Sequence, residues 1–174
     1  MPAREIVLLG DPILRRRAKE VDAFDDSLRD LLRDMFITMA AAEGAGLAAP
    51  QIGLGIRVLV ADVRREQDEQ GSLVAVVNPS IVETSSEEDR TSEGCLSIPG
   101  VTEVVCRPER AVVEGLDPEG KALRIEASGL LSRVLQHEVD HLDGVLFFDR
   151  ISPLKRRMLL KKYRKLRAEE EATV

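Results

Sequence analysis

The two histidines of this chain lie four residues apart in QHEVDHLDG (136–144), and a glutamate directly follows the first of them. On a helix, residues i and i+4 share one face with Cβ atoms about 5–6 Å apart, so His137 and His141 can reach one divalent ion. Glu138 lies one step round the helix, where it can touch a water at the ion without binding the ion itself. This is the H-E-x-x-H pattern of metallohydrolases.

Two other interpretations of this pair are weaker. An exposed helix could carry two histidines four apart by chance, but the chain has only two histidines and both belong to this pattern. A fully buried helix would have to bury Glu138, Asp140 and Asp143 as well, which is costly without partners. Leu130 and Val134 continue the histidine face by helical steps, so they predict an apolar wall beside the ion.

A catalytic metal site uses three protein ligands and one open position. Phe147 stands where the H-E-x-x-H-x-x-G-x-x-H pattern has its third histidine, and the remaining downstream glutamates, 169–171, lie in the tail. The third ligand is therefore expected upstream, from one of the two cysteines. Cys106 alternates with valines and is interpreted as a small buried hydrophobe. Cys95 follows a glycine in a turn-like stretch, so thiolate chemistry favours Cys95.

Apolar residues recur at helical spacing from Leu28 to Met39, after Asp25 and Asp26, and predict a long helix that ends at Gly44. The other expected elements are strands over 56–63, 73–84 (broken at Asn-Pro) and 101–109, a hairpin of 111–116 and 121–127, solvated loops over 65–72 and 85–92, and helices over 129–142 and after Pro153. Without βαβ alternation, this order predicts an α+β fold with largely antiparallel sheets around the central H-E-x-x-H helix, a long N-terminal helix and a C-terminal helix. Residues 1–174 are expected to form one domain.

The composition, 44% hydrophobic and 32% charged, is typical of a globular protein. No apolar run approaches the roughly 20 residues that span a bilayer, and IVLLG (6–10) is too short for an export signal. With two cysteines and no such signal, we expect free thiols, no disulfide framework and a cytoplasmic protein.

The net charge of −6 is unevenly distributed. Residues 153–174 carry eight Lys/Arg and three Glu, a net of +5, so the rest of the chain carries −11. All eight basic residues fall in PLKRRMLLKKYRKLR (153–167). One interpretation is a terminal helix docked by Leu159, Tyr163 and Leu166 with its charges solvated. The other is a phosphate-binding surface with salt-sensitive affinity.

The stretch EGAGLAAPQIG (43–53) is rich in small residues, which let a backbone approach a ligand closely. Gln51 adds one uncharged hydrogen-bond donor. Taken alone, the stretch is better explained as a loop packed against a neighbouring element.

Three stretches in order, GAGLAAPQ (44–51), EGCLS (93–97) and QHEVDH (136–141), resemble the three signature motifs of the peptide deformylase family. The resemblance extends over nearly the whole chain, through DPILRRRAKEV (11–21), VNPSIV (77–82) and GVLFFDRISPLK (144–155). It implies a metallohydrolase that removes the formyl group from the N-terminal formyl-methionine of newly made polypeptides and releases formate.

The resemblance also implies roles for individual residues. Cys95, His137 and His141 would bind the metal, with a fourth position for water, and Glu138 would be the general base and then the acid. The developing oxyanion would be bound by the Gln51 side chain and the backbone N–H of Leu96.

For the substrate, the resemblance implies that Ala45, Gly46 and Gly94 pair with the peptide backbone. Leu130 and Val134 would line the methionine pocket, and Arg107 would lie near the rim of the active site. Arg133 stands where some family members have an apolar pocket residue, although its aliphatic stem can still pack there.

Two imidazoles and a thiolate suit tetrahedral zinc. The resemblance points instead to Fe(II), replaceable by nickel, cobalt or zinc, and we follow it. The resemblance implies the formyl-methionyl nascent peptide as substrate and the ribosome as partner of the basic stretch 153–167, and we expect a monomer.

An H-E-x-x-H metallopeptidase is the alternative function, disfavoured by Phe147. A non-catalytic formyl-peptide- or ribosome-binding relative would have lost Glu138, Gln51 or Cys95.

Overall fold

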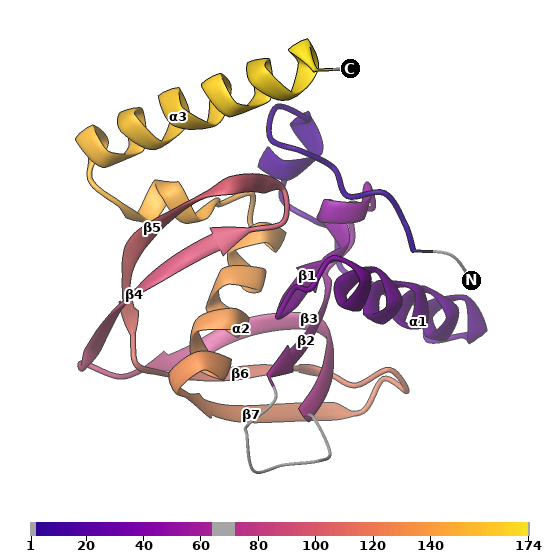
Figure 1. Ribbon diagram of the computed structural model, residues 1–174. Coiled ribbons are helices and arrows are strands. Elements are labelled where there is room, and N and C mark those ends of the chain that lie inside the picture. Colours follow the sequence, from indigo (N-terminus) through magenta and orange to yellow (C-terminus); the bar gives the residue numbers. More distant parts are fainter. Residues whose placement is uncertain (1–2, 64–71, 174) are drawn as a thin grey trace.

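The computed structural model describes residues 3–63 and 72–173 and places helix α2 (Gly129–Leu142) between two antiparallel sheets (Figure 1). The larger sheet has the strand order β1-β2-β3-β6-β7. Its strands are β1 (Gly46–Ala48), β2 (Val58–Val63), β3 (Ser72–Thr84), β6 (Arg110–Leu116) and β7 (Ala122–Ser128). The smaller sheet pairs β4 (Glu88–Cys95) with β5 (Ile98–Pro108). The predicted α+β fold around a central H-E-x-x-H helix is confirmed.

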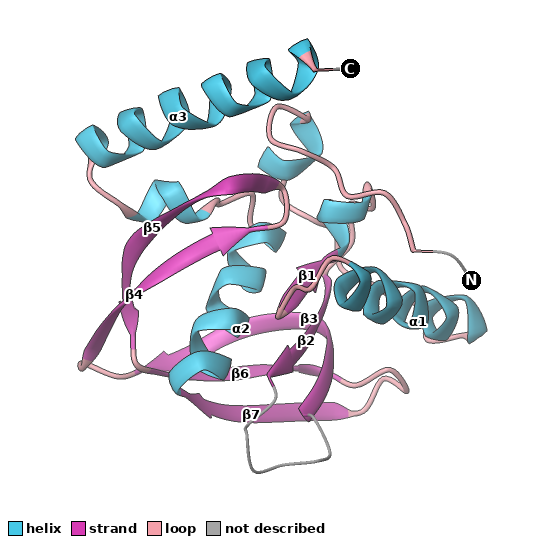
Figure 2. Cartoon of the chain, viewed as in Figure 1, coloured by secondary structure: helices cyan, strands magenta, loops and turns pink. Residues whose placement is uncertain are grey.

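Two further helices pack on the outside of this arrangement (Figure 2). Helix α1 (Asp26–Ala41) lies against the larger sheet, and α3 (Pro153–Ala172) lies along β5 of the smaller sheet. Three short 3-10 helices, η1 (Pro12–Arg15), η2 (Ala49–Ile52) and η3 (Phe147–Arg150), connect these elements. Within the described ranges, no helix combines the length and apolar character needed to cross a membrane.

Helix α1 starts where the sequence predicts and ends at Ala41, three residues before Gly44. The Asp25 side chain accepts the Leu28 N–H at 3.2 Å and satisfies one free donor of the first turn. At the other end, Glu43 takes the left-handed conformation (φ 55°) that was expected of Gly44. The N–H of Gly44 closes the turn on the Met39 carbonyl at 2.9 Å, so the helix ends in a Schellman-type turn with a non-glycine residue in the strained position.

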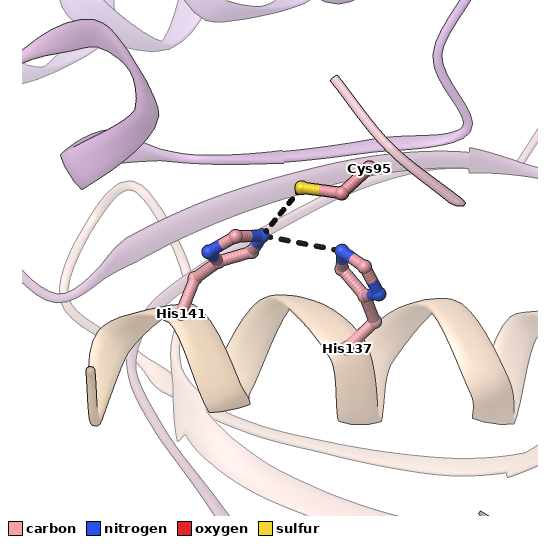
Figure 3. A group of neighbouring side chains, drawn as sticks. All are labelled: Cys95, His137 and His141. Carbon is pink, nitrogen blue, oxygen red and sulfur yellow. Dashed lines mark hydrogen bonds between the residues drawn. The ribbon is translucent and has the colours of Figure 1, made fainter. Parts of the chain in front are cut away.

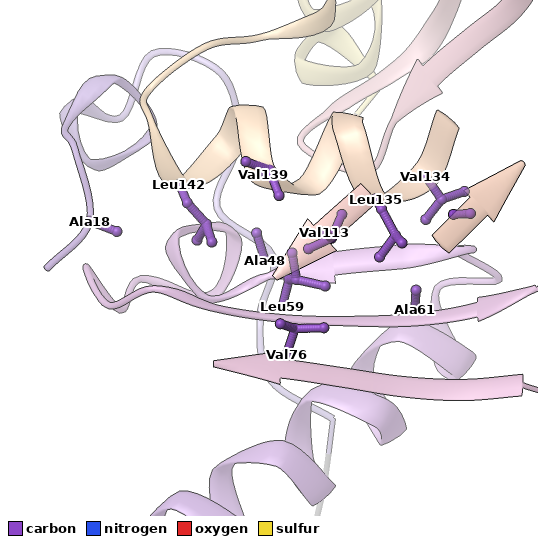
Figure 4. Close-up of a cluster of buried hydrophobic side chains, with 11 residues drawn as sticks. Ala18, Ala48, Leu59, Ala61, Val76, Val113, Val134, Leu135, Val139 and Leu142 are labelled. Atoms are coloured by element: carbon purple, nitrogen blue, oxygen red, sulfur yellow. The ribbon is translucent and has the colours of Figure 1, made fainter. Parts of the chain in front are cut away.

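The buried side chains of the described residues form three clusters, and α2 takes part in the one that supports the site. Strand β2 is buried on both faces, because its side chains alternate between two helices. Leu59 and Ala61 face α2 (Figure 4), whereas Val58 and Val60 pack with α1 on the opposite face. The third cluster joins Phe147 and Phe148 to α3 and β5. Helix α2 is therefore held by packing along its length.

The prediction of a solvated loop over 85–92 was wrong, because most of this segment belongs to β4. This strand pairs with β5 in antiparallel register from Glu88↔Pro108 to Glu93↔Glu103. Its sequence, EDRTSEGC, is polar on both faces, and Glu93 alone is buried. A strand without an apolar face lacks the alternation by which strands are recognised. The loop expected over 65–72 lies outside the described residues, except that residue 72 begins β3.

Other predictions of the elements are confirmed. The H-E-x-x-H helix has the expected bounds, and β6 and β7 form a hairpin in which the Asp117 carbonyl accepts the Gly120 N–H at 3.0 Å. The break expected at Asn78-Pro79 is a register shift within one continuous strand, with Asn78 at φ 52°.

Candidate metal centre

Three donor atoms from two elements converge beside the C-terminal half of α2. The Nε2 atoms of His137 and His141 lie 3.1 Å apart, and the Cys95 Sγ, at the end of β4, lies 3.3 Å from His141 Nε2 (Figure 3). All three donor atoms lie within 4.8 Å of one another. The i, i+4 spacing puts both imidazoles on one face of the helix, as the sequence predicts.

These donors fit one divalent ion. Both histidines are buried, and burial lowers the pKa of His141 well below its usual value. Two imidazoles and one thiolate make the three-donor set of a catalytic site with one position left for a substrate or water. Within the described part of the chain, the buried Oε2 of Glu138 has no hydrogen-bond partner, so a polar atom beside the donors is left for a ligand.

Glu93 fixes the orientation of His137. Its Oε1 lies 2.5 Å from His137 Nδ1, which leaves Nε2 pointing at the centre. Burial acts to raise the pKa of Glu93, but hydrogen bonds from Arg107 and His137 outweigh it and hold this pKa well below its usual range. Burial acts to lower the pKa of His137, but Cys95 and Glu93 outweigh it and raise that pKa. A carboxylate behind a ligating histidine is typical of metal sites.

Glu138 is buried beside the donors and lines a cavity of about 490 Å³. Burial raises the pKa of its carboxyl to about 7, which suits a group that must both accept and release a proton near neutral pH.

Gln51 and Leu96 flank the centre on the side of the small-residue stretch. The Gln51 Oε1 accepts the Ala48 N–H at 2.9 Å, which points Nε2 toward Cys95 Sγ (3.5 Å) and Ser97 Oγ (3.2 Å). Leu96 follows β4 directly, in the turn to β5, and lines the same cavity. The structure therefore brings both residues expected at the oxyanion to the donors.

The residues expected to contact substrate are distributed round this cavity. Ala45, Gly46 and Gly94 line it together with Leu130 and Val134 of α2. A Cβ on Gly46 would lie 2.8 Å from both Glu138 Oε1 and Val134 Cγ1, so only glycine fits here without displacing these two side chains. Among the described strands, β1 pairs only with β2 and β4 only with β5, which leaves one edge of each unpaired beside the cavity.

The placement of Arg107 near the rim was wrong. Arg107 is buried and does not line the cavity, because its guanidinium is held between Glu93 (2.6 and 2.9 Å) and Asp140 (2.9 Å). The expectation for Cys106 was also wrong: it lies in β5 as predicted, but it is half-buried and its thiol lies 3.0 Å from Glu88 Oε2.

Sequence reasoning missed Glu93 and Asp140. The signal for Glu93 was its position two residues before Cys95, because residues i and i+2 of a strand share a face. The prediction placed Cys95 in a turn-like stretch, where no shared face with Glu93 is expected. Asp140 lies between the two histidines on α2 and binds Arg107 and Arg150.

A buried H-E-x-x-H helix with a cysteine thiol as the third donor and a carboxyl group beside them defines a class of protein, the metal-dependent hydrolases with one ion per site. A family model described as polypeptide deformylase matches residues 3–157. The chain belongs to this family, whose members remove the formyl group from the N-terminal methionine of newly made polypeptides.

Individual relatives agree with this assignment over nearly the full length. The peptide deformylase of Brucella suis is 46% identical over 97% of this chain and 96% of its own. A crystal structure of a peptide deformylase from Legionella pneumophila superposes with a TM-score of 0.89 at 45% identity and covers 98% of each chain. The peptide deformylase from Ehrlichia chaffeensis, crystallised in complex with actinonin, gives a TM-score of 0.88 at 41% identity, covering 95% of this chain and 98% of its own.

Proposed function

We propose that Cys95, His137 and His141 hold one divalent ion and that Glu138 is the general base of deformylation. The observation that carries this proposal is the convergence of three donor atoms within 4.8 Å, with the Glu138 carboxyl lining the adjoining cavity. When bound there, the ion supplies Lewis acidity, which lowers the pKa of water from 15.7 toward ~7 and polarises a carbonyl.

Glu138 moves the proton in this account. It accepts a proton from the attacking water and returns it to the nitrogen of the formamide, because an unprotonated amide nitrogen is a poor leaving group. The C–N bond then breaks, one water is consumed, and the products are formate and a free N-terminal amine. With its pKa raised to about 7 by burial, Glu138 can serve in both directions near neutral pH.

Gln51 Nε2 and the backbone N–H of Leu96 stabilise the oxyanion. The Ala48 N–H holds the Gln51 amide by its oxygen, so the donor end is already oriented before substrate arrives. Donors that are fixed in advance need no reorganisation when charge develops, which is why they are effective in enzymes.

The substrate backbone extends along the unpaired edges of β1 and β4, where Ala45, Gly46 and Gly94 offer their main-chain groups. The methionine side chain enters the apolar part of the cavity beside Leu130 and Val134. Because all these groups and all donors come from residues 1–174 of one chain, one domain acting as a monomer is sufficient.

The native ion is Fe(II), with nickel, cobalt and zinc as substitutes. Anaerobically purified protein would be loaded in turn with Fe(II), Ni(II) and Zn(II) and assayed for formate release from a formyl-Met tripeptide. We expect Fe(II) and Ni(II) forms to exceed the Zn(II) form, and the Fe(II) form to lose activity in air. An unformylated tripeptide serves as the peptidase control; cleavage of its peptide bonds would favour the metallopeptidase alternative.

The exposed face of α3 docks on the ribosome. Arg157, Lys161, Arg164 and Lys165 are exposed, whereas Leu159 and Tyr163 are buried, so the helix can present charge without leaving its core. The triple variant of Arg157, Lys161 and Lys165 to Glu should abolish salt-sensitive co-sedimentation with ribosomes.

The matched control is Lys121→Glu, which changes an exposed residue in the hairpin turn on another part of the molecule. Unchanged co-sedimentation of the triple variant would remove the ribosome from this account while leaving the deformylase chemistry intact.

A further inference from the structure

The three donors of the metal centre come from two separately supported parts of the fold. His137 and His141 lie on α2, whereas Cys95 ends β4, which belongs to the two-stranded sheet (Figure 3). The distance between the thiol and the imidazoles therefore depends on what holds β4 against α2.

Arg133 spans this junction. It lies one helical turn before His137, is 5% exposed, and reaches β4 at two points. Its Nη1 donates to Glu93 Oε2 at 2.7 Å, and its Nη2 donates to the Asp89 carbonyl at 2.9 Å and approaches Asp89 Oδ2 at 3.4 Å. Because residues 89 and 93 lie four apart in a strand, they share one face, and one guanidinium binds both.

Glu93 links Arg133 to the ligand His137. Its Oε1 accepts from Arg107 Nη2 at 2.6 Å and faces His137 Nδ1 at 2.5 Å, and its Oε2 accepts from Arg107 Nε at 2.9 Å and from Arg133. Every side of the carboxylate is occupied, so its position is fixed, and with it the direction of His137. Partners behind a metal ligand of this kind typically change metal affinity 10- to 100-fold when removed.

We propose that Arg133 is a positioning residue that clamps β4 onto α2 and thereby sets the geometry between Cys95 and the two histidines. The inference rests on the metal centre proposed above. Arg107 pairs with both Glu93 and Asp140, so we expect the buried carboxylates to keep a cation, and the variant to fold, when Arg133 is replaced. What is lost is the direct link from Arg133 of α2 to Asp89 and Glu93 of β4.

The test compares Arg133→Met, which keeps an unbranched apolar stem, with Arg133→Lys, which keeps the charge but offers one point in place of a fork. Arg124→Met is the matched control, because Arg124 pairs with Glu114 at 2.6 Å on the exposed surface of β6 and β7. Each protein is loaded with Co(II). The measurements are the rate of Co(II) loss to a chelator, the thiolate-to-cobalt absorption band, and kcat and KM for a formyl-Met tripeptide.

We expect Arg133→Met to lose Co(II) about 10- to 100-fold faster than wild type, with a shifted thiolate band and a fall in kcat; because Arg133 also lines the cavity, the metal readouts decide the test. Arg133→Lys should fold as wild type and still lose Co(II) about tenfold faster, whereas Arg124→Met should match wild type. Wild-type Co(II) retention and spectrum in Arg133→Met would overturn the inference. So would wild-type retention in Arg133→Lys, which keeps the test decisive if the Met variant does not fold. Failure of wild type itself to bind Co(II) would overturn the proposed function as well.

Discussion

His137 and His141 both direct Nε2 to the centre of the site, but their other ring nitrogens have different surroundings. His137 Nδ1 faces the Glu93 carboxylate at 2.5 Å, whereas His141 Nδ1 has no hydrogen-bond partner within the described residues. The pKa of His137 is accordingly raised, because the negative groups around it outweigh its burial, and the pKa of His141 is lowered by burial. The site thus concentrates negative charge on one side, where it favours a cation.

Among single residues, Gln51 gives a direct test: Gln51→Ala should reduce kcat about 10²- to 10³-fold, because removal of one oxyanion donor typically costs about 2.7–4 kcal/mol. KM should change far less, since the donor acts on charge that develops only in the transition state. Steady-state kinetics of formate release would measure both constants. A variant with wild-type kcat and an intact thermal transition would remove Gln51 from the mechanism.

The sequence predicted the residues whose chemistry is unusual for the chain. Two histidines at helical spacing and a cysteine behind a glycine are rare enough to stand out, and the structure brings them together. Arg107 was misplaced because one charged residue in a strand does not reveal which buried partner it has. Its position follows from Glu93 and Asp140, which lie 14 and 33 residues away along the chain.

At the scale of elements, α3 is attached to the smaller sheet by a few apolar side chains. Leu159 is 5% exposed and packs in the cluster with Phe147 and Phe148, so Leu159→Ala should lower the free energy of unfolding by about 2–5 kcal/mol. Met158, the preceding residue, is 63% exposed, and Met158→Ala should stay within about 0.5 kcal/mol of wild type. Urea unfolding of both variants provides the comparison. Equal losses would contradict the packing of α3 described above.

Asp149, in η3, connects η1, the residue before η3 and the start of α3. Its carboxylate accepts from Arg15 Nη1 at 2.5 Å and from the Leu146 N–H at 2.9 Å, and lies 3.4 Å from Arg156 of α3. Burial acts to raise the pKa of Asp149, but the hydrogen bond from Arg15, followed by that from Leu146, outweighs it and holds this pKa below its usual value of 3.8.

A carboxyl whose pKa is depressed by folding stabilises the protein above its unfolded pKa and loses that contribution as the pH falls through the folded value. Asp149→Asn should therefore cost about 1–2 kcal/mol at pH 7, and its difference from wild type should shrink as the pH falls below 3.8 toward the depressed folded pKa. Urea unfolding of both proteins at pH 7, 5 and 3 would follow this difference. A gap of the same size at pH 7 and pH 3 would show that the charge of Asp149 contributes nothing.

Elements with a strong apolar period were predicted well, and one element without such a period was missed. Helices α1 and α2 bury one face or more and begin where the sequence indicates. Strand β4 is held by backbone pairing to β5 and by the buried Glu93, neither of which leaves a hydrophobic pattern. Its assignment depends on long-range pairing, which sequence periodicity does not report.

For the whole molecule, the position of α2 explains why a helix with so many polar residues is stable. Residues 132–142 of α2 are all buried, among them His137, Glu138, Asp140 and His141. One side packs on the larger sheet through Leu135 and Leu142, while Asp140 on the polar side binds the guanidinium groups of Arg107 from β5 and Arg150 from η3. The two sheets therefore bury these groups, and in a buried environment hydrogen bonds and charges act more strongly than in water.

The central claim, that Glu138 moves the proton in a metal-dependent deformylation, is tested most directly by formate release from a formyl-Met tripeptide in wild type and Glu138→Gln. Both proteins would carry one equivalent of the same metal, measured beforehand. We predict steady formate release by wild type and a turnover about 10²- to 10⁴-fold lower in the variant. An undiminished rate in Glu138→Gln at equal metal content would contradict the account, as would wild-type protein that binds metal and releases no formate.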